Sequence, residues 1–429
     1  MKIKCRITSK IIKSPLFVIL AISLSLAALP AAAYEVIVPG DQDGDMIVSD
    51  EELQAAIKSN EDGTISSSAL ETIREIHDQY PREFTDGAGR QITMYKPAER
   101  IITTSPDTAR MVIALGLGDK LIASEECVKN CICPTPYGVS DQGCMNCYET
   151  ILDGRLAELP VIGTSSNLQY ELIASLQPDL IVASSESQAE DLESKIDCLC
   201  VVASGTGWNY TYENGLYGLI QVMGLTLNRE EEAENLIDFV ESKVDLVRSV
   251  TQGLDDGEKP TVYIAPRGAV LGFYDPKQGR DFTRTEPNYP PVDIAGGLNV
   301  ASGEPGSSIN VALEQIIAWS PEYIFVGCID PDAMSGLDNV RTAPDLQSVT
   351  AVEDDHVYYF FYPHCRGSPP EMSLFNIIYL AKVLHPDLFG DLDLEEEGNE
   401  IFKAFLGIDG VFTEYADYMI WPREYLESQ

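Results

Sequence analysis

An acidic loop near the start of the chain carries the residues whose types and spacing best suit metal chemistry. In the stretch DQDGDMIVSDEE, three aspartates alternate and a glutamate closes the loop at its twelfth position. Carboxylates at positions 1, 3, 5 and 12, a backbone carbonyl at position 7 and an oxygen at position 9 form the ligand set of a calcium loop. The spacing therefore predicts a Ca²⁺ site. Its expected ligands are Asp41, Asp43, Asp45, Ile47, Ser49 and Glu52.

The alternative interpretation of this loop is an acidic helix N-terminus capped by Ser49 and Glu52. Position 6 is Met46, where a calcium loop normally has the glycine of its sharp turn. A second, similar stretch, KSNEDGTISSSAL, has Lys58 and Ala69 at the positions where acids are needed. Together the two stretches resemble a paired EF-hand or dockerin-like unit whose second loop has lost its metal, and the unit is expected to end near Pro81.

Cysteine forms the second concentration of reactive side chains. Five of the ten cysteines crowd into residues 127–147, in the order C-x3-C-x-C-x10-C-x2-C. This spacing matches no zinc or iron–sulfur pattern. In an exported protein, disulfides are the expected state of cysteine. We therefore interpret the segment as a disulfide-stapled insertion, whose pairing the sequence does not define.

Enzymatic chemistry has little support in the sequence. The four histidines are scattered, and no H-E-x-x-H, G-x-S-x-G or Walker pattern is present. The absence of a histidine-rich cluster also argues against the binding of a bare transition-metal ion. A net charge of −39 argues against nucleic acid and anionic membranes as partners. These observations favour a binding protein over an enzyme.

The first 33 residues have the organisation of an export signal. Five basic residues precede an apolar stretch at 16–29, and Ala31 and Ala33 suit a small-residue cleavage site. The apolar stretch is short for a membrane span, so cleavage is expected rather than anchoring. We expect a soluble protein on the outer face of the cytoplasmic membrane.

The elements that must position a site follow a repeated pattern. The stretches ELIASLQPDLIV, from Glu171, and EQIIAWSPEYIFV, from Glu314, each predict a short helix, a proline and a buried strand. A hairpin at 84–94, a strand at 101–103, a helix capped by Ser105 and a helix at 373–384 are also expected. Residues 229–250 contain neither glycine nor proline and predict one long helix with an apolar stripe.

The β-α alternation predicts an α/β fold with parallel sheets in two lobes. The expected organisation is a leader at 1–33, a small helical calcium-loop unit at 34–81, an N-terminal lobe at 84–228, an interlobe helix at 229–256 and a C-terminal lobe with its final helices at 257–429.

The ordered series DGAGRQITMYKPAERIITTSP, ALGLGDKLIA, ELIASLQPDLIV, VDIAGGLNVA, EQIIAWSPEYIF and YLAKVLHPDLFGDLDLEEE resembles a known family. It is similar to the binding proteins that serve ABC importers of iron–siderophores, haem and cobalamin. The resemblance covers about residues 84–410. It implies two Rossmann-like lobes joined by a rigid helix, with the ligand between them. The chain departs from the family in two places. The family usually has an acid within the first helix after its Ser-Pro pair, where this chain reads DTARM, and the cysteine-rich insertion is not general in the family.

The resemblance implies a ligand that is an iron chelate, haem or a corrinoid, a permease dimer with its ATPase as partner, and a monomeric state. Aromatic rings can cover the faces of such a ligand, and arginine can pair with its acidic rim. The candidate ligand-binding residues, all where strands give way to loops, are Ser105, Trp208, Tyr210, Arg267, Tyr289, Tyr362, His364 and Arg366. The resemblance also assigns Glu171 and Glu314 to contacts with the two permease subunits.

A second hypothesis from a different class is a calcium-dependent cell-surface scaffold protein. It rests on the dockerin-like unit, and a cohesin-like partner would support it. A co-purifying coloured chelate would instead support import.

Overall fold

The computed structural model describes residues 37–126, 155–266, 282–328, 335–361 and 368–413. A small N-terminal unit comes first and contains α1 (Asp50–Glu61) and α2 (Ser67–Gln79). Ser49 and Ser66 cap the two helices, and the helices pack through residues such as Ala56, Leu70 and Ile73. The unit contacts the body of the protein where Asn228 Nδ2 donates to the Glu75 carboxylate at 3.1 Å.

The first lobe contains a parallel sheet in the order β4-β3-β7-β8. An antiparallel hairpin, β1 with β2, precedes this sheet, as the sequence predicted. The elements of this region are β1 (Arg82–Thr85), β2 (Gln91–Met94), β3 (Ile101–Thr103), α3 (Pro106–Ala114), η1 (Gly118–Lys120), β4 (Leu121–Ala123), α5 (Arg155–Glu158), β5 (Gly163–Thr164), β6 (Asn167–Leu168), α6 (Tyr170–Leu176), β7 (Leu180–Ala183), α7 (Glu186–Lys195), β8 (Cys200–Val202) and α8 (Leu216–Leu227).

The second lobe contains a parallel sheet in the order β11-β9-β13-β14. Its elements are β9 (Thr261–Ala265), β10 (Arg284–Thr285), α10 (Pro290–Ile294), β11 (Leu298–Asn299), β12 (Ile309–Asn310), α11 (Leu313–Trp319), β13 (Tyr323–Cys328), α12 (Ser335–Thr342), η4 (Pro344–Leu346), α13 (Thr350–Glu353), β14 (Val357–Phe361), α14 (Pro370–Leu384), α15 (Pro386–Phe389) and α16 (Leu394–Leu406).

The two sheets have the same topology. In each, the strand that comes second in the chain lies at one edge, followed by the first, third and fourth. The strands are buried on both faces, as in parallel sheets covered by helices: all four residues of β7 are buried, as are the last four of β9. This confirms an α/β fold with two parallel-sheet lobes.

The repeated sequence pattern occupies the same place in both lobes. Helices α6 and α11 each span seven residues and end at a residue in the left-handed conformation, Gln177 (φ 49°) and Ser320 (φ 42°). The chain then passes through a proline into the third strand of its sheet, β7 or β13. The two stretches are therefore equivalent helix–strand units of two similar lobes.

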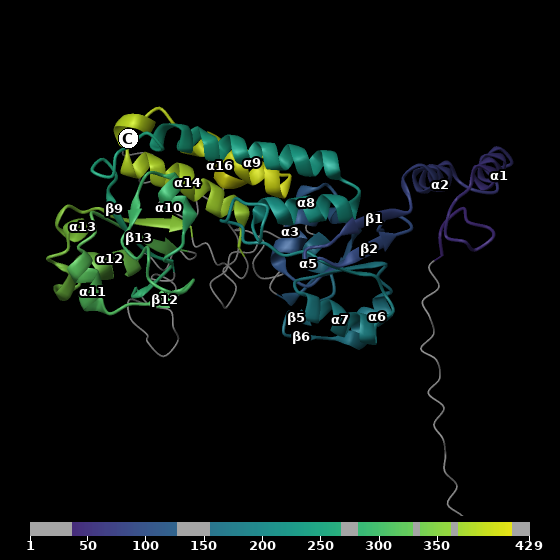
Figure 1. Cartoon of the computed structure of the whole chain (residues 1–429), viewed down its shortest axis with the longest axis horizontal. Helices are drawn as coiled ribbons and strands as arrows, with labels where there is room; N and C mark the ends of the chain where they lie inside the picture. Colours follow the sequence, from purple (N-terminus) through teal and green to yellow (C-terminus); the bar gives the residue numbers. More distant parts are fainter. Residues whose placement is uncertain (1–36, 127–154, 267–281, 329–334, 362–367, 414–429) are drawn as a thin grey trace, which may run out of the picture. The chain divides into compact units, whose positions relative to one another are not determined.

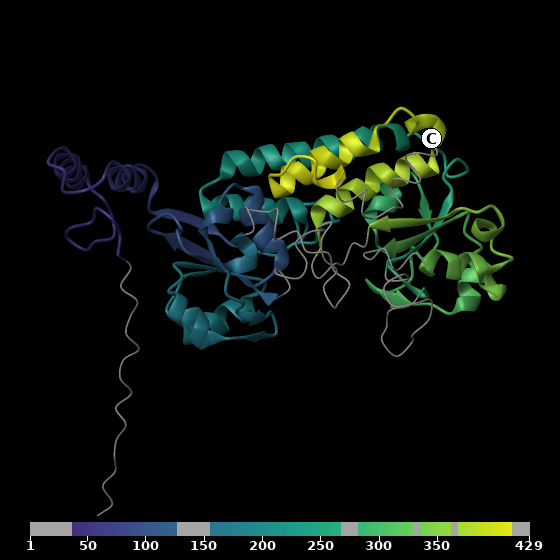
Figure 2. The same cartoon turned by 180° about the vertical axis from the view of Figure 1, so that it is seen from behind.

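The long helix predicted at 229–250 is present as α9 (Glu230–Thr251) and connects the two sheets in sequence. Its predicted apolar stripe is buried: Ala233, Leu236, Ile237, Val240, Val244 and Val247. Helix α9 contacts α8 of the first lobe and α14 of the second, and these helices run side by side in Figures 1 and 2. Helix α14 is buried along its whole length, because α9, α10, β14 and α16 pack around it.

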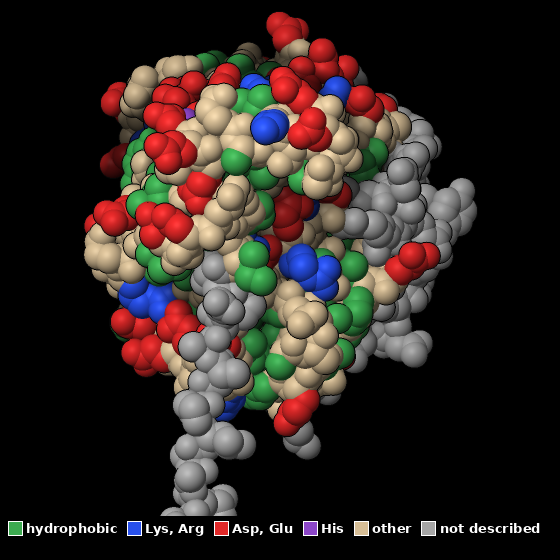
Figure 3. All heavy atoms as spheres, turned by 90° about the vertical axis from the view of Figure 1, so that its right-hand side faces the viewer, with side chains coloured by type: hydrophobic (Ala, Val, Ile, Leu, Met, Phe, Trp, Pro, Cys, Tyr) green, Lys and Arg blue, Asp and Glu red, His purple; other side chains and the backbone are tan. Residues whose placement is uncertain are grey.

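Figure 3 shows one face of the protein on which acidic side chains predominate over basic ones, consistent with the net charge of −39. Within the described residues, no helix is both long enough and apolar enough to cross a membrane.

Candidate functional site

Ligands of parallel α/β sheets bind at the carboxyl ends of the strands. In the first lobe, β3 leads into Ser105, β7 into Ser184 and β8 into the loop that carries Trp208. In the second lobe, β9 and β14 lead almost directly into 267–281 and 362–367. These two segments contain Arg267, Tyr362, His364 and Arg366, so the four predicted ligand residues lie outside the described part of the chain.

Ser105 has a structural role in addition to any contact with ligand. It is the N-cap of α3, where its hydroxyl accepts from the Thr108 backbone N–H at 3.3 Å and lies 3.0 Å from the Thr108 hydroxyl. Pro106 follows at the first helical position, where its missing N–H has no consequence. The predicted residue is therefore held at the carboxyl end of β3 by helix capping.

The structure brings two of the predicted aromatic residues together. The rings of Trp208, from the first lobe, and Tyr289, from the second, lie 6.3 Å apart at an angle of 55°. Tyr289 is 2% exposed, and its hydroxyl accepts from the Asn376 side-chain amide at 3.0 Å. Trp208 is half-buried, so it offers more accessible ring surface than its neighbour.

Tyr210 also comes from the loop after β8 and is buried beside Tyr217, with ring centroids 6.4 Å apart. Its hydroxyl is enclosed and has no hydrogen-bond partner among the described residues. Burial raises the pKa of Tyr210 well above its usual range, so the phenol stays neutral. The residue therefore lies under the surface of the predicted site.

A buried ion pair joins the two lobes. Arg110 of α3 donates through Nε to Glu371 Oε1 of α14 at 3.2 Å, and the side chains are 0% and 1% exposed. Asp107, one turn before Arg110, accepts from the Ser368 backbone N–H at 2.7 Å. The contact thus anchors the chain at Ser368 directly after the segment that carries the predicted His364 and Arg366.

Burial dominates the electrostatics of this junction. It raises the pKa of the Glu371 carboxyl, although the Arg110 guanidinium opposes that change. Burial likewise raises the pKa of Asp107. Glu371 Oε2 has no hydrogen-bond partner among the described residues. The junction therefore holds its charged groups in surroundings that exclude water.

The sequence prediction did not include Arg110 or Glu371. The charged residues of DTARM could have indicated a buried ion pair, because an arginine within an otherwise apolar helix needs a partner when it is buried. The identity of that partner, 261 residues away, required the structure.

The acidic loop brings its three aspartates together. One carboxylate oxygen from each of Asp41, Asp43 and Asp45 lies within 4.8 Å of the others. Asp41 accepts from the backbone N–H groups of Gly44 at 2.7 Å and Met46 at 2.9 Å, so it shapes the turn. Met46 has φ 67°, a left-handed conformation that disfavours residues with a side chain. The sharp turn of this acidic loop is therefore made by a methionine, where a calcium loop normally has glycine.

The remaining predicted calcium ligands lie at the start of α1. The Glu52 carboxylate accepts from the Ser49 N–H and hydroxyl, both at 2.9 Å, and from the Gln42 N–H at 2.5 Å. The Ser49 N–H is the main cause that lowers the pKa of Glu52. Ile47 donates its N–H to Asp45 at 2.9 Å, and its side chain is exposed. The helix-capping interpretation of Ser49 and Glu52 is thus confirmed, while the calcium site and the EF-hand or dockerin-like assignment stay predictions.

The cysteine-rich segment at 127–147 lies outside the described residues. Cys198 and Cys200, by contrast, are buried free thiols, so the general expectation of disulfides is wrong for these two. They lie two positions apart at β8, and burial raises the pKa of both. They are inert residues of the core.

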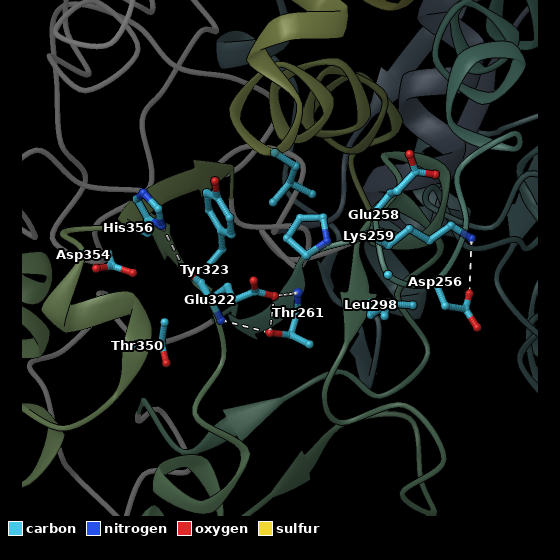
Figure 4. A pocket seen from close by; sticks show the side chains of 13 residues that line it. Asp256, Glu258, Lys259, Thr261, Leu298, Glu322, Tyr323, Thr350, Asp354 and His356 are labelled. Atoms are coloured by element: carbon cyan, nitrogen blue, oxygen red, sulfur yellow. Dashed lines mark hydrogen bonds and ion pairs between the residues drawn. The ribbon is translucent and has the colours of Figure 1, made fainter.

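A hollow of about 460 Å³ lies at the other ends of the strands of the second sheet. Figure 4 shows the side chains that line it. It lies at the amino ends of β9 and β13, where Glu322 accepts from the Thr261 N–H at 2.7 Å and the rings of Tyr323 and His356 stack at 4.5 Å. None of the predicted ligand residues that the structure describes lines it. The hollow therefore lies at the opposite ends of the strands from the carboxyl ends, where parallel sheets bind ligands.

Comparisons with known proteins agree with this architecture. The profile of the Periplasmic binding protein family matches residues 101–360. The chain is 22% identical to a molybdate-binding protein of Haemophilus influenzae, over 58% of this chain and 73% of that protein. It is 24% identical to a vitamin B12-binding protein of Vibrio parahaemolyticus, over 61% of this chain and 81% of that protein.

Among solved structures, an ABC transporter solute-binding protein from Sulfurospirillum deleyianum has the same fold. The TM-score is 0.60 with 21% sequence identity, covering 79% of this chain and 99% of that one. Two equivalent parallel-sheet lobes, a connecting helix and polar residues at the lobe junction define a two-lobed solute-binding protein. The chain belongs to the periplasmic binding protein family.

Members of this family are extracytoplasmic binding proteins rather than enzymes, and they work with a transporter and a small-molecule solute. The family membership gives no support to the alternative of a scaffold protein.

Proposed function

We propose that this protein captures a metal-containing solute between its lobes and delivers it to the permease of an ABC importer. The observation that carries the proposal is the pair of equivalent sheets bridged by the buried Arg110–Glu371 contact, in a chain that matches the family over residues 101–360. The proposed ligands are iron–siderophores, haem and corrinoids. Relatives named for vitamin B12 and molybdate support a metal-related solute.

The proposed ligand contacts come from both lobes. Trp208 is half-buried at the junction and packs against the buried Tyr289, so its ring can cover the face of a flat ligand. Arg267, Tyr362, His364 and Arg366 follow the carboxyl ends of β9 and β14 in the sequence, where ligand contacts are expected. Ser105 marks the matching end of β3.

Titration of the purified protein with ferric siderophores, haem, cobalamin and molybdate tests the proposal. Tryptophan fluorescence is a suitable signal because Trp208 lies at the junction. Saturable binding of one of these solutes, weakened by Arg366→Ala or His364→Ala without a change in melting temperature, would support it. Failure of all four classes to bind would contradict it.

The repeated helix–strand unit suggests how the protein docks. Glu171 and Glu314 are both exposed and lie in the first turns of α6 and α11, which are equivalent elements of the two lobes. A carboxylate is favoured there by the helix dipole, by a few tenths to about 1 kcal/mol. We propose that the two residues meet basic side chains on two permease subunits, since a two-lobed protein facing a two-fold partner repeats the same contact.

The acidic loop is proposed to bind one Ca²⁺ ion and to order α1 and α2. The ligand spacing supports this, together with the close approach of the carboxylates of Asp41, Asp43 and Asp45. We further propose that residues 1–33 form a leader and that the protein is a monomer. The proposed domain ranges are 34–81, 84–228, 229–256 and 257–429.

A further inference from the structure

A second hollow, of about 440 Å³, lies against the interlobe helix α9. One wall comes from the loop after β8 and the first turn of α8, with Tyr210, Tyr212 and Tyr217. The other comes from α9, with Glu241, Asp245 and Arg248. Figures 1 and 2 show α8 and α9 side by side. Its volume falls within the range of about 300–1,000 Å³ that is usual for small-molecule sites.

The aromatic wall is a group of three tyrosine rings around Tyr217. The Tyr212 and Tyr217 rings lie 5.5 Å apart at 57°, and the Tyr210 and Tyr217 rings lie 6.4 Å apart at 56°. The rings are therefore tilted rather than stacked on one another. Tyr210 and Tyr217 are 9% and 6% exposed, so most of the accessible ring surface belongs to Tyr212. Tyr212 is 57% exposed although it is a large aromatic residue. Tyrosine faces carry a negative potential that attracts cations.

The opposite wall adds negative charge. Glu241 and Asp245 lie four residues apart on α9, so they share one face of the helix. Arg248 lies 3.6 Å from Asp245 and balances that carboxylate. Among the described residues, Glu241 has neither an ion-pair partner nor a hydrogen-bond partner. The hollow thus combines aromatic faces with one uncompensated carboxylate.

We propose that this hollow binds a small organic cation of the quaternary ammonium class. A quaternary ammonium ion is held by aromatic faces and a nearby carboxylate without needing a hydrogen bond to its nitrogen. A metal ion fits the hollow less well. Among the described residues, the only cluster of three His, Cys, Asp or Glu side chains close enough to hold a metal ion is the one formed by Asp41, Asp43 and Asp45. The site is distinct from the proposed solute site at the carboxyl ends of the strands, although one loop contributes Trp208 to that site and Tyr210 to this one.

Choline and its neutral isostere 3,3-dimethylbutan-1-ol are the probes that test the proposal, titrated into the full-length exported protein by calorimetry. Choline should bind, and the neutral isostere should bind more weakly, because only choline carries the charge. Tyr212→Ala and Glu241→Gln should each weaken choline binding by about two- to fivefold. Tyr212→Phe keeps the ring and should bind nearly as the wild type does.

Glu234→Gln is the matched control, since it removes the same charge from an exposed position of the same helix without touching the hollow. It should leave choline affinity unchanged. The proposal is overturned if choline does not bind at millimolar concentrations, if both probes bind equally, or if neither Tyr212→Ala nor Glu241→Gln weakens binding more than Glu234→Gln. Loss of choline binding in these variants while metal-chelate binding persists would separate this site from the proposed import function.

Discussion

The buried contact between Arg110 and Glu371 offers a sharp test of how the lobes are joined. In Arg110→Met, the Glu371 carboxyl stays 1% exposed but loses its cation. Removal of one partner from a buried pair generally destabilises a protein by about 3–5 kcal/mol, because the remaining charge has no compensation.

The geometry places the expected loss at the lower end of that range. Among the described residues, Arg110 makes one hydrogen bond to Glu371, at 3.2 Å, rather than a bidentate pair. Its contact with Asp107, at 3.7 Å, is too long for a hydrogen bond. Glu371 can also take up a proton, because burial already raises its pKa. We therefore expect a loss of about 3 kcal/mol, or a factor of about 10² in the unfolding equilibrium.

Urea unfolding near neutral pH, followed by tryptophan fluorescence, measures this loss. Lys403→Met is the matched control, because Lys403 and Asp409 form a 2.7 Å pair whose side chains are 56% and 81% exposed. That control should hardly move the unfolding midpoint. The double variant Arg110→Met with Glu371→Leu should recover most of the stability, since an apolar pair needs no charge compensation.

Two results would refute the reasoning. Unfolding of Arg110→Met at the same urea concentration as the wild type would mean that the contact contributes nothing to the union of the lobes. A double variant less stable than either single variant would mean that packing rather than charge governs the site.

Four further predictions follow from the other sites. Calorimetry should detect one Ca²⁺ ion bound by the loop at 41–52 in the millimolar range or tighter, and an absence of binding would leave that loop as a helix cap. The pKa of His77 is raised by its hydrogen bonds to Asp78 and to Asp50 of α1. The stabilisation from these contacts is therefore complete below the unfolded pKa of about 6.5 and is lost as the pH rises through the folded value. His77→Gln should remove this contribution to the pH dependence of the melting temperature, and an unchanged profile would contradict it. Glu171→Lys or Glu314→Lys should preserve fold and solute affinity but impair transport in reconstituted vesicles, and full transport by the double variant would reduce both residues to helix-terminal acids. Non-reducing mass spectrometry should find paired cysteines within 127–147, and free thiols throughout or stoichiometric zinc would reject the stapled insertion.

Elements whose signals are local in the chain could be predicted from the sequence. The strand at Ile101–Thr103 has the predicted bounds, because a proline-led, serine-capped helix follows it directly. Helix α9 begins and ends within one residue of its prediction, since an uninterrupted apolar stripe needs no tertiary information to be recognised. The equivalence of α6–β7 and α11–β13 was also visible, because both copies carry the same helix, proline and strand pattern.

Tertiary structure alone decided which distant residues meet. The sequence contained Asp107 and Arg110, but the partners Ser368 and Glu371 lie 261 residues away, and no local pattern encodes such a contact. Tyr289 was expected as an accessible ligand face, yet packing of α10 against α14 leaves it 2% exposed. An amino-acid type and its neighbours determine local conformation through sterics and hydrogen bonding, whereas burial and pairing depend on how the whole chain closes around its core. That is the physical reason why the sequence determined the lobes and the structure determined their junction.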